Sequence, residues 1–364
     1  MFRIRKLNTS HYQQMIHIMV TSPMKTPFIE VLFDKGPDIS LINEVWSNKY
    51  NYYGVFSHNL LVGFGSRLEY DGYLNKGKCS FSYLGNFCIH PDYRQKGLFK
   101  KLVEFILEEA IQTENICFSI VLKGNAPVER YFSNKRYQFQ GLLNFKVLDT
   151  YVTQSILITK RRKTSDDYQI QKATEHHKTQ IINLLVSEFK RKNFAPIITK
   201  KTFENKINGT YNIHLNDYIL AFKDSRIVGI CGVWKMQKLK RTKIVRYKSW
   251  FQLMLIYYKL LSKIFKYPRL PHSGETLKEV YLTDLFVEEN NPAILQAMLF
   301  NINNELKTKN YNLIHFAMSK TNPLLKATKP FFAVSTYSNI YATSKNLKLL
   351  SNEDGHPYID IALI

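Results

Sequence analysis

Cysteine is scarce in this sequence of 364 residues, and where it occurs it forms no motif. The four cysteines, Cys79, Cys88, Cys117 and Cys231, lie far apart and none forms a CxxC pair. This pattern excludes a disulfide framework and a zinc site built on paired cysteines, and we expect no bound metal. A reducing, cytoplasmic compartment is the simplest expectation.

Long apolar runs are also missing. The longest lies near residues 251–258, far short of the roughly 20 residues that a membrane-spanning helix needs. The first ten residues, MFRIRKLNTS, alternate charged and apolar side chains and lack the apolar centre of a signal peptide. With 45% hydrophobic and 22% charged residues, the composition indicates a soluble, globular protein.

Acidic residues are few. Aspartate and glutamate number 29 against 51 lysines and arginines, which gives a formal net charge of +22. A protein of this charge attracts anions such as nucleic acid, an acidic membrane surface or a phosphorylated ligand. Alternatively, lysine is simply the default polar residue of the surface. Charge alone does not decide between the two interpretations.

The chain does contain an internal repeat. Residues 2–20 align without gaps to residues 168–186, a shift of 166, and the same shift aligns residues 52–66 with 218–232. After an insertion the shift grows to about 197. Repeat units of solenoid proteins are only about 20–50 residues long, so this pattern indicates duplication of a whole domain.

The repeat predicts two domains, residues 1–160 and 161–364, with an insertion in the second at about residues 235–275. Each copy begins with a short alternating strand and an amphipathic helix, followed by a β-hairpin. A further strand, a long helix, a buried strand, a short helix and closing strands then follow in the same order.

One loop of the first copy has the features of an anion site. Between a predicted strand (residues 80–89) and a predicted helix (residues 98–111) lies the basic run Arg94-Gln95-Lys96-Gly97. The first backbone N–H groups of a helix lack partners, and the helix dipole adds positive charge there. Glycine allows a ligand to approach the backbone closely. The loop therefore suits a phosphate group.

The run Arg94-Gln95-Lys96-Gly97-Leu98-Phe99 resembles the acetyl-CoA motif Q/R-x-x-G-x-G/A of the GNAT superfamily of N-acetyltransferases. The resemblance implies a mixed α/β (α+β) fold with two GNAT-like domains, each a mostly antiparallel twisted sheet flanked by helices. It also implies acetyl-CoA as co-substrate, its pyrophosphate held by the amides of the turn and its pantetheine arm paired with the preceding strand. The implied cofactor-binding residues are Phe87, Cys88, Ile89, Arg94, Gln95, Lys96, Gly97, Leu98, Phe99 and Asn125.

The sequence departs from the family pattern at three points. Phe99 replaces the second small residue, which we expect to tighten the loop. Phe132 stands where many members have a general-acid tyrosine, with Tyr131 one residue earlier, and we predict Tyr131 as the acid. The strand before the loop has no carboxylate to act as base. Other segments offer four candidates among which the sequence does not choose: Glu30, Asp34, Glu69 and Asp71.

The second copy lacks the phosphate loop. It has Glu289-Asn290-Asn291-Pro292-Ala293 at that position, without glycine, and Asn322 opposite Asn125. We predict an ordinary helix start, with Asn291 as N-cap and Pro292 at the first helical position. This half is expected to be a degenerate GNAT-like domain that braces the first or helps to form an acceptor pocket.

The insertion is basic and amphipathic, with no acidic residue between positions 235 and 274. We expect a helical cap packed on the domain interface with its lysines in water. The alternative is a peripheral membrane element or a nucleic-acid contact.

These features predict an N-acetyltransferase whose first copy passes an acetyl group from acetyl-CoA to an amine by direct attack. A small-molecule amine or amino sugar is the expected acceptor. One alternative is aminoacyl transfer from charged tRNA, which would suit the positive charge. Another is a non-catalytic adaptor that binds CoA or another anion.

Overall fold

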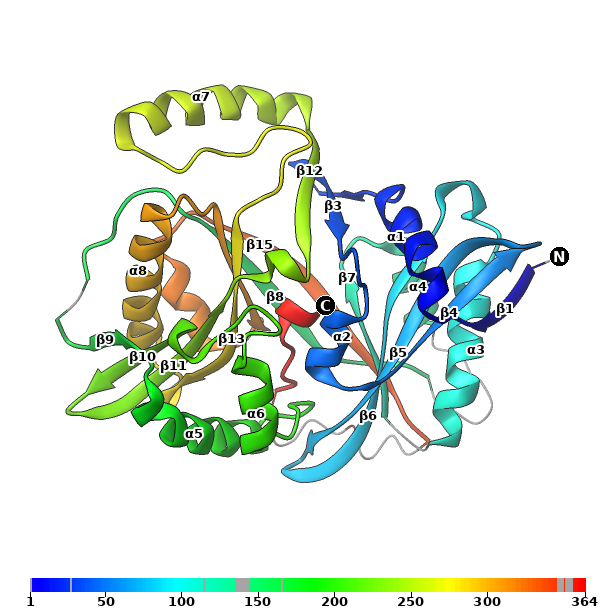
Figure 1. Ribbon diagram of the computed structural model, residues 1–364, viewed down its shortest axis with the longest axis horizontal. Coiled ribbons are helices and arrows are strands. Elements are labelled where there is room, and N and C mark those ends of the chain that lie inside the picture. The colour runs from blue at the N-terminus through cyan, green and yellow to red at the C-terminus, as the bar shows by residue number, and fades with distance from the viewer. Residues whose placement is uncertain are drawn as a thin grey trace.

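The computed structural model describes residues 2–26, 28–113, 116–134, 144–164, 166–345, 350 and 356–364. Helices flank a large twisted sheet that extends across the molecule (Figure 1). The strands are β1 (Phe2–Lys6), β2 (Met24–Lys25), β3 (Ile29–Asp34), β4 (Lys49–Ser57), β5 (Leu60–Leu74), β6 (Gly77–Ile89), β7 (Ile116–Leu122), β8 (Lys146–Leu157), β9 (Gln169–Lys172), β10 (Tyr218–Lys223), β11 (Arg226–Trp234), β12 (Arg241–Tyr247), β13 (Glu279–Val287), β14 (Leu313–Ser319) and β15 (Ala333–Thr343). The α-helices are α1 (Tyr12–Val20), α2 (Leu41–Trp46), α3 (Leu98–Gln112), α4 (Ala126–Phe132), α5 (Lys178–Lys190), α6 (Lys200–Ile207), α7 (Ser249–Phe265) and α8 (Pro292–Thr308).

The large sheet follows the order β1-β4-β5-β6-β7-β15-β8-β14-β13-β11-β10-β9 in the described part of the chain. Neighbouring strands are antiparallel except for two parallel pairs, β6–β7 and β13–β14. The fold class expected from the sequence, mixed α and β with a mostly antiparallel sheet flanked by helices, is therefore confirmed. The two parallel pairs occupy equivalent places in the two copies.

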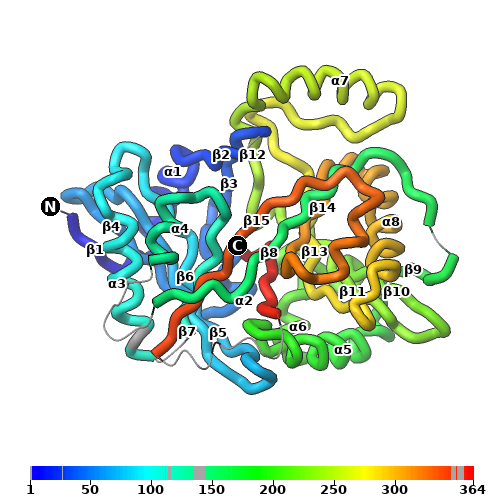
Figure 2. The backbone as a smooth tube through the Cα atoms, turned by 180° about the vertical axis from the view of Figure 1, so that it is seen from behind, coloured from blue at the N-terminus to red at the C-terminus, as the bar shows by residue number. Residues whose placement is uncertain are grey.

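The last strand of each copy pairs with the other copy. From the end of the first copy, β8 pairs with β14, and from the end of the second, β15 pairs with β7. The two exchanged strands also pair with each other, so that one sheet passes through both halves (Figure 2). We therefore propose that the boundary near residue 160 separates two copies in the sequence rather than two independent folding units.

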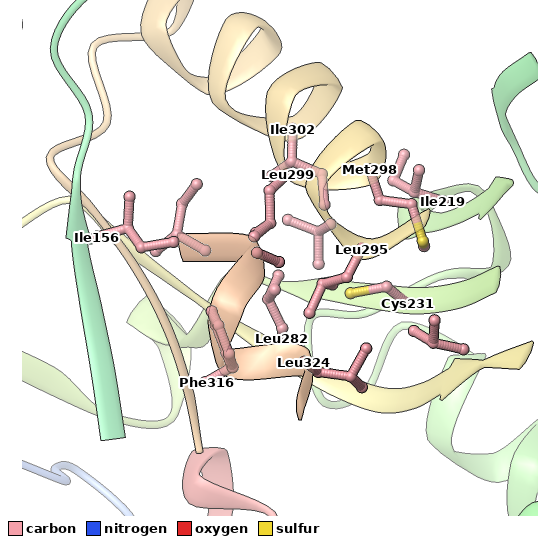
Figure 3. Close-up of a cluster of buried hydrophobic side chains, with 14 of the residues drawn as sticks. Ile156, Ile219, Cys231, Leu282, Leu295, Met298, Leu299, Ile302, Phe316 and Leu324 are labelled. Carbon is pink, nitrogen blue, oxygen red and sulfur yellow. The ribbon is translucent and has the colours of Figure 1, made fainter. Parts of the chain in front are cut away.

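A hydrophobic core between helix and sheet fixes the long helix of each copy. In the second copy, α8 places Leu295, Met298, Leu299 and Ile302 over Leu282 and other sheet residues (Figure 3). In the first, α3 buries Leu98, Leu102, Val103, Ile106 and Leu107. These spacings of three and four residues place one face of α3 against the sheet. The start of α3 is thereby held beside the end of β6.

The insertion of the second copy departs from expectation. Its strand β12 pairs with β3 of the first copy, from Arg241 opposite Asp34 to Tyr247 opposite Ile29. The helix α7 has no buried residue and lies away from the sheet in both views (Figures 1 and 2). The helix therefore does not bury an apolar face as the expected cap would, and its ring contact with the first copy is with Phe28. In the described residues, no helix is long and apolar enough to cross a membrane.

Candidate functional site

The turn between β6 and α3 is open to solvent. After β6 the chain makes a short helical turn, Pro91–Tyr93, and then takes positive φ angles at Gln95 (62°) and Gly97 (70°). Residues 94–97 are exposed, whereas Leu98 is buried and anchors the helix start. A Cβ atom built on Gly97 would meet no atom within 4 Å. The buried Leu98 thus fixes the turn on the core, and residues 94–97 remain accessible to solvent.

The amides of this turn are available to a ligand. Within the described residues, no hydrogen bond is made by the backbone N–H groups from Gln95 to Phe99, and Lys101 N–H donates to the Gly97 carbonyl at 3.2 Å. The helix dipole adds positive potential at this end. Lys96 Nζ lies 4.7 Å from the Tyr93 ring centre, beside the turn. Such a cluster of unpaired donors and positive charge is suited to phosphate oxygens.

Along the last residues of β6, before the turn, β6 and β7 separate. They pair only from Phe81 opposite Ile116 to Tyr83 opposite Phe118, after which β7 pairs with β15 alone. His90 N–H donates to the Val62 carbonyl on β5. Because successive peptide groups of a strand point to opposite edges, those of Ile89 face the gap instead. Arg94 Nε reaches the Ile89 carbonyl from that side, at 3.1 Å.

A β-bulge lies at the inner end of the gap. The pairing of β5 with β6 shifts between Phe64 and Ser66, and Asn86 has a φ of 54°. The second copy has the same irregularity, with Asp284 at a φ of 50°. The bulge and the gap are therefore features of both copies of the fold.

Cys88 and Phe87 lie on the strand between the bulge and the turn. Both are partly buried, and burial raises the pKa of the Cys88 thiol, whose Sγ lies 3.8 Å from the Ile18 carbonyl oxygen. Phe87 instead contacts the Phe99 ring, with 5.3 Å between ring centres. The strand residues named from the sequence thus flank the gap.

The remaining residues named from the sequence lie at the helix α4. Asn125 is the exposed N-cap of α4, and its side chain makes no capping bond. The rings of Tyr131 and Phe99 are 5.5 Å apart. Phe132, at the position of the family's tyrosine, is only 1% exposed and belongs to the core. The Phe99 ring packs towards Phe87 and Tyr131, and the backbone around Gly97 stays open despite its bulk.

In the second copy, protein side chains already cap the equivalent turn and the start of the following short helix. Asn291 accepts a hydrogen bond from Ala293 N–H at 3.0 Å, with Pro292 at the first helical position, as the sequence predicts. Asn322, opposite Asn125, accepts from Leu324 N–H at 2.9 Å. Glu288 adds negative charge beside this turn, although Arg226 pairs with it at 3.0 Å. Self-capping and acidic charge make this turn unsuited to an anion.

The four carboxylates offered by the sequence as bases all have protein partners. A hydrogen bond from Arg246 holds the pKa of Glu30 below its usual range. Burial opposes ionisation of Asp34, but Gly36 N–H, Arg241 and Lys243 still hold its pKa low. Glu69 pairs with Arg67 at 3.1 Å, and Asp71 accepts from the Ser80 hydroxyl at 2.6 Å. Glu30 and Asp34 on β3 bind basic side chains of β12, and their function is therefore structural.

A buried lysine that the sequence analysis missed lies at the bulge. Lys35 is 6% exposed and donates from Nζ to Asn86 Oδ1 at 2.7 Å. Asn86 Nδ2 in turn donates to Ser66 Oγ at 2.9 Å. Burial and the nearby charge of Lys240 lower the pKa of Lys35 to about 7. No sequence signal marks it, since it follows β3 in a segment without periodicity.

Comparison with known proteins agrees with this geometry. Residues 3–123 match a family model described as an acetyltransferase (GNAT) domain. Over these residues the chain is similar to a GNAT domain. No curated protein matches the chain. The GNAT match supports an acyltransferase as the general class, and it bears out the expected family for residues 3–123.

Solved structures share the fold over nearly the whole chain. A GCN5-related N-acetyltransferase from Sphaerobacter thermophilus is 9% identical, with a TM-score of 0.60 over 99% of this chain and 98% of that chain. The Saccharomyces cerevisiae N-myristoyltransferase with bound myristoyl-CoA is 12% identical, with a TM-score of 0.60 over 94% and 82%. A GCN5-related N-acetyltransferase from Anabaena variabilis is 10% identical, with a TM-score of 0.53 over 96% and 74%.

Proposed function

We propose that this protein is an N-acyltransferase that moves an acyl group from a CoA thioester, with acetyl-CoA as the expected donor, to an amine. The reaction takes place in the first copy of the fold. The observation that carries the proposal is the contrast between two equivalent turns. The amides from Gln95 to Phe99 make no hydrogen bond in the described residues, whereas Asn291 caps the corresponding turn of the second copy.

The donor lies along the turn and the gap. Its pyrophosphate accepts hydrogen bonds from the amides of residues 95–99, with Arg94 and Lys96 adding positive charge. Its pantetheine arm runs back along β6 past Ile89, Cys88 and Phe87, in the gap where β6 and β7 no longer pair. Three residues of strand span ~10 Å, which brings the thioester to the bulge at Asn86. The exposed side-chain amide of Asn125 is a further polar contact on the far side of the gap.

The amine must lose a proton before it attacks, because an ammonium has no free electron pair. A lysine-like amine has a pKa of ~10.4 and is mostly protonated at neutral pH. Lys35, whose pKa burial lowers to about 7, lies at the bulge and is matched to the task of general base. It takes the proton of the amine while the nitrogen–carbon bond forms.

Collapse of the intermediate breaks the carbon–sulfur bond and leaves a CoA thiolate. Tyr131 is the proposed acid that protonates this sulfur, since its ring touches Phe99 beside the gap. Phe132 has no ionisable group. A backbone N–H near Cys88 or Ile89 polarises the carbonyl. The second copy supplies β15 beside β7 and β12 beside β3, and so holds both sides of the site.

The acceptor is proposed to be a small-molecule amine or an amino sugar. Calorimetry with acetyl-CoA tests the donor, and release of free thiol over a panel of amines, amino sugars and peptides tests the reaction. Acetyl-CoA binding with amine-dependent thiol release is the expected result. Binding without turnover on any amine would indicate an adaptor instead. Steeply salt-dependent binding of tRNA, with no binding of CoA, would indicate aminoacyl transfer.

A further inference from the structure

The helix α7 exposes an unusual amount of apolar surface. Seven of its large side chains are more than half exposed: Trp250 at 52%, Leu253 at 73%, Ile256 at 58%, Tyr257 at 63%, Leu260 at 57%, Ile264 at 71% and Phe265 at 54%. A helix of a water-surrounded domain ordinarily turns such residues towards a core. Exposed apolar patches of this kind mark sites of interaction.

The exposed apolar side chains lie on the face of α7 that points away from the rest of the protein. Half-buried side chains recur at Phe251, Leu255 and Tyr258, and Tyr258 donates from its hydroxyl to the Pro268 carbonyl of the returning chain. Phe251 also contacts Phe28 of the first copy, with 5.4 Å between ring centres. At ~100° per residue, Leu253 and Leu260 lie on the opposite side of the helix. One face thus attaches α7 to the protein and the other is left uncovered.

Positive charge borders this apolar face. Lys259 and Lys263 lie on the flank of α7, and Lys266 follows its last turn, all exposed. None of the three forms an ion pair within the described residues. No acidic residue occurs between positions 225 and 274. Unpaired lysines beside an apolar face favour an anionic surface that also takes up apolar side chains.

We infer that α7 binds the surface of an anionic lipid bilayer and lies in its interfacial plane. Leu253, Leu260 and Ile264 enter the region of the acyl chains, and Trp250 and Tyr257 lie at the level of the headgroups, where such rings are favoured. Lys259 and Lys263 contact lipid phosphates. The helix has 17 residues, and it lies on the membrane rather than across it. This inference does not depend on the proposed acyl transfer.

Sedimentation with vesicles tests the inference on the full chain. The protein should bind vesicles of phosphatidylglycerol and phosphatidylcholine in equal parts, less in high salt, and poorly to phosphatidylcholine alone. The variant Leu253→Glu/Ile264→Glu should bind at least ~10-fold more weakly. The matched control is Leu60→Glu/Phe332→Glu, which changes two residues of similar exposure, 58% and 61%, by the same charge. It should bind as the wild type does.

Two further measurements separate the outcomes. The fluorescence of Trp250 should shift to shorter wavelength with anionic vesicles, and Trp250→Phe should remove the shift. Lys259→Gln/Lys263→Gln should weaken binding more than Lys200→Gln/Lys201→Gln, a control pair of exposed lysines on α6. Equal binding by the α7 variant and its control would overturn the inference. A second result would also overturn it: the wild type forms a dimer in light scattering and does not bind vesicles, and the α7 variant is a monomer. The exposed face of α7 would then be covered by a second copy of the chain.

Discussion

The substitution Gly97→Asp tests the proposed donor site most directly. It places a carboxylate at a turn where a Cβ atom meets nothing within 4 Å, and where the diphosphate of CoA is expected. At ~5 Å and an effective dielectric constant of ~40–80, repulsion by two phosphate charges amounts to ~2 kcal/mol after screening. The dissociation constant of acetyl-CoA should therefore rise ~30-fold.

A matched control separates this repulsion from backbone strain. Gly97 has a φ of 70° and Gly274 a φ of 87°, and neither has an atom within 4 Å of a built Cβ. Any L-residue in this left-handed region costs ~1–2 kcal/mol. Gly97→Asp and Gly274→Asp should thus lower the free energy of unfolding similarly and change the net charge equally. Only the first should weaken acetyl-CoA binding.

Calorimetry with two ligands completes the test. S-acetyl-pantetheine, which has no diphosphate, should bind the wild type and Gly97→Asp with equal affinity. If Gly97→Asp binds acetyl-CoA as tightly as Gly274→Asp does, the turn does not hold the diphosphate. The reasoning from unpaired amides to a donor site would then be refuted.

Three further predictions concern the interior and the acid–base groups. The pKa of Lys35 is about 7 in the folded protein, against 10.5 for the ordinary side chain. Between these two pH values the unfolded chain binds one more proton than the folded chain, so the free energy of unfolding measured in urea should rise by about 1 kcal/mol per pH unit. An unchanged slope in Lys35→Met would contradict the low pKa. Tyr131→Phe should lower kcat ~100-fold without changing acetyl-CoA affinity, and an unchanged kcat would remove Tyr131 as the acid. Phe132→Ala should cost ~3–5 kcal/mol in urea unfolding because its ring is buried, whereas a loss below 1 kcal/mol would show that the core around it has been misjudged.

Features that depend on near neighbours in the chain could be predicted from the sequence. The basic loop before α3 and the start of α8 at Asn291 and Pro292 both depend on bonds within a few residues. The duplicated element order follows from the alternation of apolar residues, and the fold class is what the resemblance of residues 94–99 to the GNAT motif implies. The open turn is therefore readable from the sequence itself, because its glycine and its missing cap are local properties.

The tertiary structure alone decided three other features. The exchange of β8 and β15 between the copies is invisible in the sequence, because either strand could satisfy the same open edge. The engaged state of Glu30 and Asp34 depends on β12, more than 200 residues away in the chain. Lys35 acquires its lowered pKa only when remote segments bury it. Burial and strand partners are set by long-range packing, and an amphipathic pattern such as that of α7 shows that a helix has an apolar face without showing what covers it.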